Sequence, residues 1–444
     1  MSKRIYGLLS VLVLASMILA ACGTPATPTT APTQAATQPP AATTAPTQAP
    51  AAYTCTDPLG CVTIGPSDPV HLAFWGVLSG SDASLGEDSK RGVEIALQDA
   101  GKFQGHDFLL TSEDALCTPE GGATAASKLA TDTSLVALVG SSCSDETVGG
   151  IAAITNAGLT TISPSNTRPA LTDPNRSPDY AGYLRTAHSD AFQGKAVAEF
   201  AYNVLGARTA ATIHDGSAYA QALQQVFADN FKQLGGTIVA QEAVAKTDTD
   251  MHPVLTTIAA SNGGKAPDFL YFPVFVAAGG YIASQAKEVA GLENTKLAGS
   301  DGMFSPDFLK AAGAGAQDMY LSSPDFSAFP AGYKNFVSEY EAKYGQAPIS
   351  IFHAHAYDAT NIILAALAKV AVVEADGTIY VPRQALREAI YATKDFAGVT
   401  GTLSCSPSGD CGAPVIAVYQ IVNTDSASWN PQDATNPNPK KVYP

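Results

Sequence analysis

Short apolar runs alternate with segments of helical periodicity along most of this chain. From about residue 66 onward, each apolar run ends in a loop rich in Gly, Ser, Asp or Pro, and a helical segment follows that loop. The apolar runs predict strands at Val70–Leu78, Asp107–Ser112, Leu135–Gly140, Leu159–Ser163, Thr209–His214, Thr237–Glu242, Asp268–Phe275 and Lys296–Ala298. The predicted helices are Arg91–Gln98, Gly121–Ala130, Glu146–Ala157, Phe192–Leu205, Ala218–Leu234, Ala277–Val289, Gly332–Tyr344 and His353–Val370.

The predicted strands are apolar at nearly every position, which indicates burial on both faces. Helices on both sides of a parallel sheet bury strands in that way. The number of βα units exceeds what one such sheet accommodates, so the pattern predicts an α/β protein with two doubly wound lobes. We expect the first boundary between the lobes near Thr186–Ser189.

The loops that follow the predicted strands are candidates for a binding site, because ligands of such folds bind beyond the carboxyl ends of the strands. Their residues are mostly small or hydroxylated, and few are charged. This chemistry favours hydrogen bonds to a small polar ligand. The loops are Leu78–Gly80, Gly140–Glu146, Ser163–Thr167, His214–Tyr219, Pro273–Phe275 and Gly299–Gly302.

The composition narrows the possible classes of protein. Of the 444 residues, 46% are hydrophobic and 15% are charged, which excludes disorder throughout. The 40 acidic residues outnumber the 25 Lys and Arg residues, and the formal net charge is -15. A surface of that charge repels nucleic acid and anionic lipid headgroups, so we expect no nucleic-acid partner.

The first 52 residues indicate export. Residues 1–21 combine a basic start with an apolar run at Leu8–Leu19 that is too short for a comfortable membrane span. The sequence Leu19-Ala20-Ala21-Cys22 resembles the lipobox of bacterial lipoproteins, in which the signal is removed and the Cys is lipidated; an ordinary signal peptide with a chance cysteine is the alternative. After Cys22, residues up to 52 are only Gly, Thr, Pro, Ala and Gln, so residues 22–52 are predicted to be a disordered tether.

Six cysteines follow Cys22, and an even number in an exported chain suggests disulfides. Several connectivities are possible, and we favour pairing between sequence neighbours. That pairing gives Cys55–Cys61, Cys117–Cys143 and Cys405–Cys411. A metal site made of these cysteines is disfavoured, because the sequence has no C-x-x-C spacing.

Sequence signatures of catalysis are missing from the chain. It has no G-x-S-x-G nucleophile elbow, no G-x-x-x-x-G-K-S/T phosphate loop, no G-x-G-x-x-G and no H-E-x-x-H. Its seven histidines are scattered. We therefore expect a protein that is not an enzyme and that holds no cofactor or metal.

Seven short segments, spread over roughly residues 68–422, carry a resemblance to a known family. They are Val77–Gly80 with Leu85-Gly86, Asp114–Cys117 with Cys143-Ser144, Ile162–Thr167, Leu184–Thr186, His214-Asp215 with Tyr219, His355–Ala359 and Gly398–Leu403. In this order they resemble the leucine/isoleucine/valine-binding protein family, the extracytoplasmic solute-binding components of ABC importers. The resemblance implies a type I periplasmic-binding fold, with two lobes that are joined by three crossovers and close over the ligand.

The same resemblance implies where the lobes lie. The first lobe is expected at residues 66–188 plus 326–398, the second at residues 189–325 plus 399–423, and a C-terminal tail at residues 424–444. The family's disulfide near the first lobe's site corresponds to Cys117–Cys143. A Cys405–Cys411 bridge would hold together a hairpin that the family has before its last strands.

The resemblance also places candidate ligand-binding residues in the first lobe. Ser144 corresponds to a residue that binds the ligand's α-carboxylate, and a serine there also suits the N-cap of a helix that starts at Asp145. Ser165 and Thr167, in one segment with Asn166, match residues that contact the carboxylate and the ammonium group. A plain helix cap and a plain Ser-Pro turn are the alternatives for these positions.

Further candidates follow in the second lobe and around the ligand's side chain. Asp301 matches the family's acidic residue that pairs with the ligand ammonium, although its segment also suits an ordinary turn. Tyr219 matches an aromatic residue that closes on the ligand. The chain departs from the best-known members at Leu85 and Phe275, where they have an aromatic residue and a tyrosine, and it has Asp in place of Glu. Phe352 is a further candidate for the side-chain pocket.

The sequence therefore favours a lipid-anchored solute-binding protein that captures a small amino acid and delivers it to an ABC permease. The ligand would be of branched-chain or aliphatic type or a related polar molecule, and the departures leave that preference open. The alternatives are an extracytoplasmic sensing module for a membrane receptor and a binder of another small organic acid or amide. We expect a monomer at the cell surface or in the periplasm, held to the membrane by its lipid alone.

Overall fold

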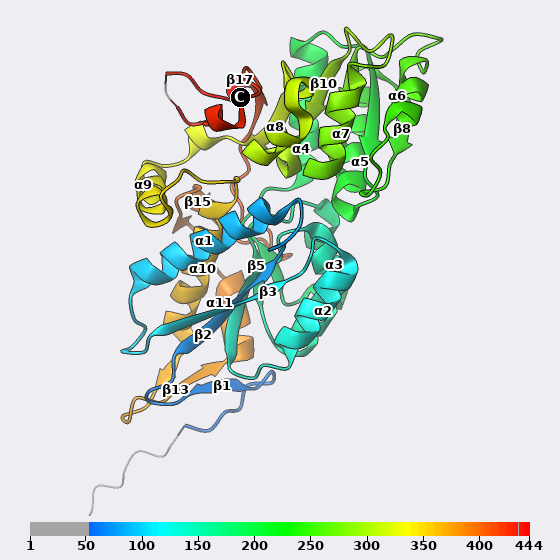
Figure 1. Cartoon of the computed structure of the whole chain (residues 1–444). Helices are drawn as coiled ribbons and strands as arrows, with labels where there is room; N and C mark the ends of the chain where they lie inside the picture. Colours follow the sequence, from blue (N-terminus) through cyan, green and yellow to red (C-terminus); the bar gives the residue numbers. More distant parts are fainter. Residues whose placement is uncertain (1–52, 434) are drawn as a thin grey trace, which may run out of the picture. The chain divides into compact units, whose positions relative to one another are not determined.

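The computed structural model describes residues 53–433 and 435–444 (Figure 1). The predicted export signal, Cys22 and the predicted tether lie outside the described residues. Two largely parallel sheets flanked by helices make up most of the described chain, and the chain passes between them after β6, after β11 and before β16. No helix in the described ranges is both long enough and apolar enough to cross a membrane.

The first sheet is wholly parallel and has the strand order β3-β2-β4-β5-β6. Its strands are β2 (Val70–Gly76), β3 (Phe108–Asp114), β4 (Leu135–Gly140), β5 (Thr161–Ser163) and β6 (Tyr183–Arg185). The helices of this part are α1 (Ala83–Ala100), α2 (Pro119–Ala130), α3 (Ser144–Asn156), α9 (Gly332–Tyr344), α10 (His353–Val370) and α11 (Arg383–Tyr391).

Successive residues of β2 point to opposite faces of this sheet. Leu72 and Phe74 join a core with side chains of α1 and α10, whereas Ala73 and Trp75 join a second core with side chains of α2 and α3. All four side chains are fully buried. Because helices cover both faces, the strand needs apolar residues at every position, which is the pattern in its sequence.

The second sheet has the strand order β17-β16-β11-β10-β9-β7-β8. The strands from β8 to β11 run parallel, and β16 and β17 are added antiparallel. The strands are β7 (Thr209–His214), β8 (Thr237–Ala243), β9 (Phe269–Tyr271), β10 (Lys296–Gly299), β11 (Tyr320–Pro324), β16 (Ile416–Gln420) and β17 (Lys440–Tyr443). Its helices are α4 (Asp190–Glu199), α5 (Ala218–Gln233), α6 (His252–Ala259), α7 (Val276–Ala286) and α8 (Pro306–Ala312).

Two small antiparallel sheets accompany the first lobe. One joins β1 (Cys61–Ile64), β13 (Ile379–Pro382) and β12 (Val372–Val373), and the other pairs β14 (Phe396–Ala397) with β15 (Thr402–Leu403). These elements differ from the expected division, since β1 precedes residue 66 and β15 follows residue 398. Val62 of β1 and Leu403 of β15 both lie in the core of the first lobe. The sequence-based boundaries missed β1 because its pairing partner β13 is distant along the chain. They missed β15 because it is only two residues long and pairs with the equally short β14.

The end of the chain also differs from the expectation. Residues 424–444, which the sequence alone assigns to a tail, include β17, and this strand pairs with β16 at the edge of the second sheet. The helices α6, α8 and α11 and the strands β6 and β11 are further elements that the periodicity did not predict. Most of them are short, and a short apolar run gives too few periods to identify.

The six cysteines of the described chain form three disulfides. They are Cys55–Cys61, Cys117–Cys143 and Cys405–Cys411. The structure therefore has the pairing between sequence neighbours. Next to the third bridge, Asp410 forms an ion pair of 3.0 Å with the fully buried guanidinium of Arg185 at the end of β6. The hairpin closed by Cys405–Cys411 thus supplies the counter-charge of a buried arginine.

Candidate ligand-binding site

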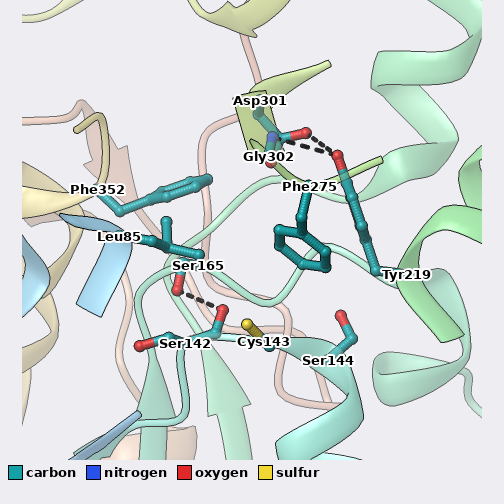
Figure 2. Close-up of a pocket in the computed structure, with 10 residues that line it drawn as sticks. All are labelled: Leu85, Ser142, Cys143, Ser144, Ser165, Tyr219, Phe275, Asp301, Gly302 and Phe352. Atoms are coloured by element: carbon teal, nitrogen blue, oxygen red, sulfur yellow. Dashed lines mark hydrogen bonds between the residues drawn. The ribbon is translucent and has the colours of Figure 1, made fainter. Parts of the chain in front are cut away.

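A small cavity lies between loops of the two sheets, close to the carboxyl ends of parallel strands (Figure 2). The space between its lining residues is about 250 Å³ and includes open solvent. Ten residues line it: Leu85, Ser142, Cys143, Ser144, Ser165, Tyr219, Phe275, Asp301, Gly302 and Phe352.

Seven of the nine ligand-binding residues that the sequence predicts line this one cavity. They come from helices and loops of both lobes and from segments more than 200 residues apart. They are Leu85, Ser144, Ser165, Tyr219, Phe275, Asp301 and Phe352. Their juxtaposition is a structural finding, and their contact with a ligand stays a prediction.

Asn166 and Thr167, the other two predicted residues, do not line the cavity. Asn166 is fully buried, and its amide group bonds to Ser141 and accepts a hydrogen bond of 2.6 Å from Thr147. Thr167 is buried as well, and its carbonyl accepts the backbone N–H of Asp190 at 2.8 Å. Both residues hold neighbouring loops in place.

The start of α3 forms one side of the cavity. Ser144 is the first residue of this helix and Cys143 is its N-cap, so the expectation that Ser144 is the cap is wrong by one residue. The reason is Glu146, whose carboxylate accepts the backbone N–H groups of Ser142 and Cys143, each at 2.8 Å, in place of a serine cap. The first N–H groups of a helix have no partner within it, and its positive dipole end favours an anion.

Hydroxyl groups add to this side of the cavity. Ser165 donates its hydroxyl to the carbonyl of Ser142 at 2.8 Å. The hydroxyl of Ser142 itself is buried without a hydrogen-bond partner among the described residues. The sequence identified the loop that contains Ser142 but not this residue, because only its orientation distinguishes it from its serine neighbours. An oxyanion at this side would meet hydroxyl donors and the helix terminus.

Asp301 occupies the opposite side of the cavity, directly after β10. Its Oδ1 accepts hydrogen bonds from the hydroxyl of Tyr219 at 2.5 Å and from Nε2 of Gln193 at 2.7 Å. Burial, together with the charge of Asp301, raises the pKa of Tyr219 well above its ordinary value, so the phenol remains a donor. Donors from α4 and α5 therefore fix the orientation of this carboxylate, which an isolated turn would not require.

Apolar side chains form the remaining wall. Leu85 of α1 and Phe352, next to α10, come from the first lobe, and Phe275 comes from the second lobe. The rings of Phe275 and Tyr219 lie 5.2 Å apart, centroid to centroid. Lys246 packs on the outer side of Phe275, with its ammonium 4.9 Å from the ring centroid and 2.9 Å from the carbonyl oxygen of Cys117.

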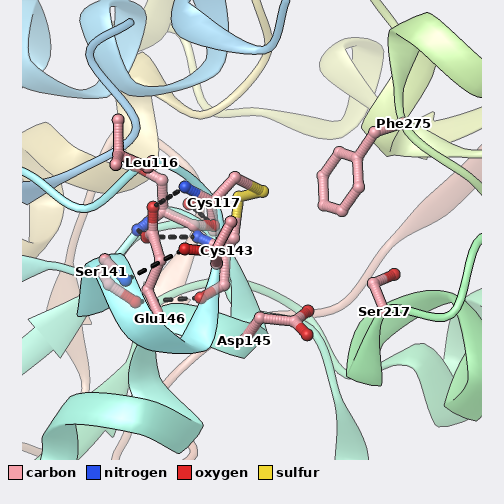
Figure 3. The surroundings of a disulfide bond; sticks show 12 residues. Leu116, Cys117, Ser141, Cys143, Asp145, Glu146, Ser217 and Phe275 are labelled. Atoms are coloured by element: carbon pink, nitrogen blue, oxygen red, sulfur yellow. Dashed lines mark hydrogen bonds between the residues drawn. A yellow bond between two sulfur atoms is a disulfide. The ribbon is translucent and has the colours of Figure 1, made fainter. Parts of the chain in front are cut away.

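The disulfide Cys117–Cys143 supports the α3 side of the cavity (Figure 3). Below it, the carboxylate of Glu146 accepts the backbone N–H of Cys117 at 2.9 Å as well as that of Cys143. Glu146 is fully buried, and burial raises its pKa to about 7. One carboxylate and one disulfide thus join the loop of Cys117 to the segment that carries Ser142 and Ser144.

Comparison with known proteins identifies the family. Residues 69–425 match the model of the periplasmic binding protein family, which is more than half of the chain. The chain belongs to this family. An amino acid binding protein of Pseudomonas aeruginosa is 29% identical over 265 residues, which are 59% of this periplasmic binding protein and 68% of that relative. The Leu/Ile/Val-binding protein of Escherichia coli is 25% identical over 317 residues, 69% of this chain and 83% of that relative.

Solved structures agree with the family assignment. The substrate binding protein of a branched-chain amino acid transporter from Streptococcus pneumoniae, in complex with isoleucine, aligns with a TM-score of 0.69 and 26% identity. The alignment covers 85% of this periplasmic binding protein and 100% of that chain. A leucine binding protein from Thermotoga maritima has a TM-score of 0.70 at 23% identity, covers 80% and 96% of the two chains, and shows the fold alone. The predicted type I periplasmic-binding fold is confirmed.

Family membership defines the general role. Periplasmic binding proteins bind substrates and do not convert them, and they act outside the cytoplasm. The cavity described above is therefore the candidate site for a solute.

One further group of titratable side chains lies on the Asp301 side of the cavity of this periplasmic binding protein. Side-chain atoms of His188, Asp190 and Asp301 that could coordinate a metal ion lie within 4.8 Å of one another. In the described ranges this is the one such group of three. We assign no metal ion to it. Protein donors already bind Oδ1 of Asp301, and Nε2 of His188 bonds to Gln193 at 2.6 Å. No cofactor is assigned to the cavity either.

Proposed function

We propose that this periplasmic binding protein captures a small amino acid by closure of its two lobes and delivers it to an ABC permease. The anion-favouring side of the cavity receives the α-carboxylate, Asp301 receives the ammonium group, and the apolar wall receives the side chain. The relatives named for amino acids support this assignment.

One observation carries the proposal: the two sides of the cavity differ in the charge that they favour. Ser142, Ser144 and the start of α3 lie on one side, and Asp301 lies on the other. A zwitterion satisfies both sides at once, since a charge-assisted hydrogen bond at Asp301 contributes about 1.5–3 kcal/mol. A simple carboxylic acid satisfies only the first side.

A thermal-shift screen tests the ligand class. The purified full chain is screened against the twenty amino acids and, for each aliphatic one, its 2-hydroxy analogue, which lacks the ammonium group. A ligand at 100 times its Kd adds about 2.7 kcal/mol to the unfolding free energy, so we expect Tm to rise by several degrees with one amino-acid class.

The variant Asp301→Asn should abolish that rise, whereas Asp229→Asn, at an exposed position of α5, should preserve it. A shift with the 2-hydroxy acids and none with the amino acids would contradict the amino-acid assignment. Binding that survives Asp301→Asn unchanged would remove Asp301 from the site.

We further propose that a lipid on Cys22 holds the protein at the membrane, and that residues 22–52 act as its tether. The lipobox-like sequence before Cys22 supports this. Mass spectrometry of the mature N-terminus should find a diacylated Cys22, and Cys22→Ser should move the protein from the membrane fraction to the soluble fraction. An unmodified N-terminus on a membrane-free protein would contradict the anchor.

A further inference from the structure

Asp190 is a buried carboxylate whose two oxygens lack a well-formed hydrogen bond. It begins α4, directly after the first crossover, and it is fully buried. Neither of its carboxylate oxygens has a hydrogen-bond partner among the described residues. A buried ionised carboxylate in such a place is costly, so it needs either a proton or a nearby cation.

One neighbouring side chain can donate: the hydroxyl of Thr167, which has no other partner among the described residues and acts to lower the pKa of Asp190. The remaining neighbours supply acceptors more readily than donors. His188 is neutral, because burial lowers its pKa. Nε2 of Gln193 donates to Asp301 and to Ser322, so the amide oxygen of Gln193 faces Nε2 of His188 and must accept its proton. The other nitrogen of His188, Nδ1, then carries a lone pair, and it too has no partner.

The charged and titratable groups around Asp190 leave it without a free cation. Asp301 is the nearest carboxylate, and Tyr219 and Tyr271 approach with their phenol groups. Among the described residues, Arg185 is the cation that acts on Asp190, but its guanidinium is paired with Asp410. Burial and the charge of Asp301 therefore raise the pKa of Asp190 well above its ordinary value.

We propose that Asp190 is protonated in the ligand-free protein, and that capture of a cationic ligand group by Asp301 releases this proton to solvent. The proposal rests on the proposed function. In this proposal Asp190 is a positioning residue: it acts through Asp301 and favours ligands with a positive charge.

The exchange is balanced in charge. Without ligand, the Asp190–Asp301 pair carries one negative charge and one proton. With an ammonium group at Asp301, the O–H bond of Asp190 breaks, the proton goes to water, and two carboxylates face one cation. The buried net charge is -1 in both states, so the ligand replaces the proton without adding uncompensated charge. A neutral 2-hydroxy group at the same place cannot replace the proton.

Calorimetry on the full chain tests the proposal without any substitution. L-isoleucine is titrated in buffers of different ionisation enthalpy at neutral pH, or another amino acid if the screen favours it. We expect release of about one proton per ligand bound, and an affinity that rises about tenfold per pH unit below the pKa of Asp190. Infrared difference spectra should show loss of a protonated carboxyl band when the ligand binds.

Two variants assign the proton to its residue. Asp190→Asn should bind the amino acid without proton release and with an affinity that no longer follows pH in this range. Asp229→Asn should retain both the proton release and the pH dependence. If Asp190→Asn does not fold, the wild-type protein still tests the proposal. Binding without proton release and without loss of the protonated carboxyl band would overturn it.

The other outcomes separate this proposal from the proposed function. Amino-acid binding without proton release would overturn the role of Asp190 and leave the proposed function intact. Failure of every amino acid would overturn both. A third outcome would be that zinc or manganese binds the ligand-free protein, is retained through dialysis and is no longer bound by Asp190→Asn. This result would mean that a metal ion, and not a proton, neutralises Asp190, and it would overturn the proposal.

Discussion

The carboxylate of Asp145 accepts the backbone N–H of Ala218, with its two oxygens 3.1 and 3.2 Å from that nitrogen. Asp145 lies in the first turn of α3, and Ala218 is the first residue of α5. Figure 3 shows the Asp145 carboxylate directed toward Ser217, the N-cap of α5. A residue of the first lobe therefore adds a second, anionic cap to a helix of the second lobe.

We predict that Asp145→Ala weakens ligand binding. In the proposed cycle the lobes separate when the ligand leaves, so the contact with Ala218 forms only on closure. Loss of a helix cap costs about 1 kcal/mol, which raises Kd about fivefold. Calorimetric titration with the amino acid from the screen measures this, with Asp229→Ala as the control. An unchanged Kd would mean that the contact does not contribute to closure.

Tyr219→Phe should lower the stability of the protein itself. The substitution removes the hydroxyl that donates to Asp301 and contacts Ser300 at 2.6 Å. A hydrogen bond to a charged group contributes about 1.5–3 kcal/mol, and we expect the unfolding free energy to fall by that amount. Urea denaturation of the ligand-free protein measures it. Tyr281→Phe, at a partly exposed position of α7, should have almost no effect; equal effects of the two variants would argue against the hydrogen bond.

The three disulfides should differ in their contribution to stability. Cys117 and Cys143 are 26 residues apart, and Cys55 and Cys61 are 6 apart. In the loop-entropy model, the longer loop stabilises by about 3–4 kcal/mol and the shorter by about 2 kcal/mol. Calorimetry of the two double Cys→Ser variants compares them. A larger loss for the Cys55–Cys61 pair would show that strain or unfolded-state structure outweighs loop length.

Glu146 should make stability depend on pH. Its pKa in the folded protein is about 7, raised by burial, and exceeds the ordinary value of a glutamate. The folded state therefore retains a proton that the unfolded state loses between about pH 4.5 and pH 7, so this group makes stability fall as pH rises through that window. We expect Glu146→Gln to become more stable relative to wild type from pH 4.5 to pH 7.5.

Denaturant unfolding at several pH values measures this difference. Glu341→Gln, at an exposed position of α9, serves as the control and should differ from wild type by a constant amount. A constant difference for Glu146→Gln as well would show that the carboxyl does not titrate in this window.

Much of the architecture could be predicted from local patterns. The β2 and β4 strands are apolar at each position because helices cover both faces, and that requirement is visible in their sequences. Elements whose stability comes from a distant partner were not predictable in the same way. The four residues of β17 form a strand because β16 offers its edge, and β1 forms one because β13 does.

The residues of the candidate site also differ in whether the sequence alone could identify them. Ser144, Tyr219 and Asp301 could be named because their loops resemble the ligand-binding segments of a known family, and each of these loops follows a predicted strand. Ser142 and Asp190 could not, since what distinguishes them is a missing hydrogen-bond partner. Such a lack depends on every neighbour that the fold brings near.

The sequence by itself determined the class of fold, the pairing of the cysteines and most residues of the cavity. Local periodicity, short separations and the resemblance of the loops to those of a known family were sufficient for these. Only the tertiary structure decided that Glu146 also binds the backbone of Cys117, that Asp145 caps α5 and that Asp190 lies beside Asp301. The physical reason is that burial and electrostatics act through space. They are set by side chains that are far apart along the chain and adjacent in the folded protein.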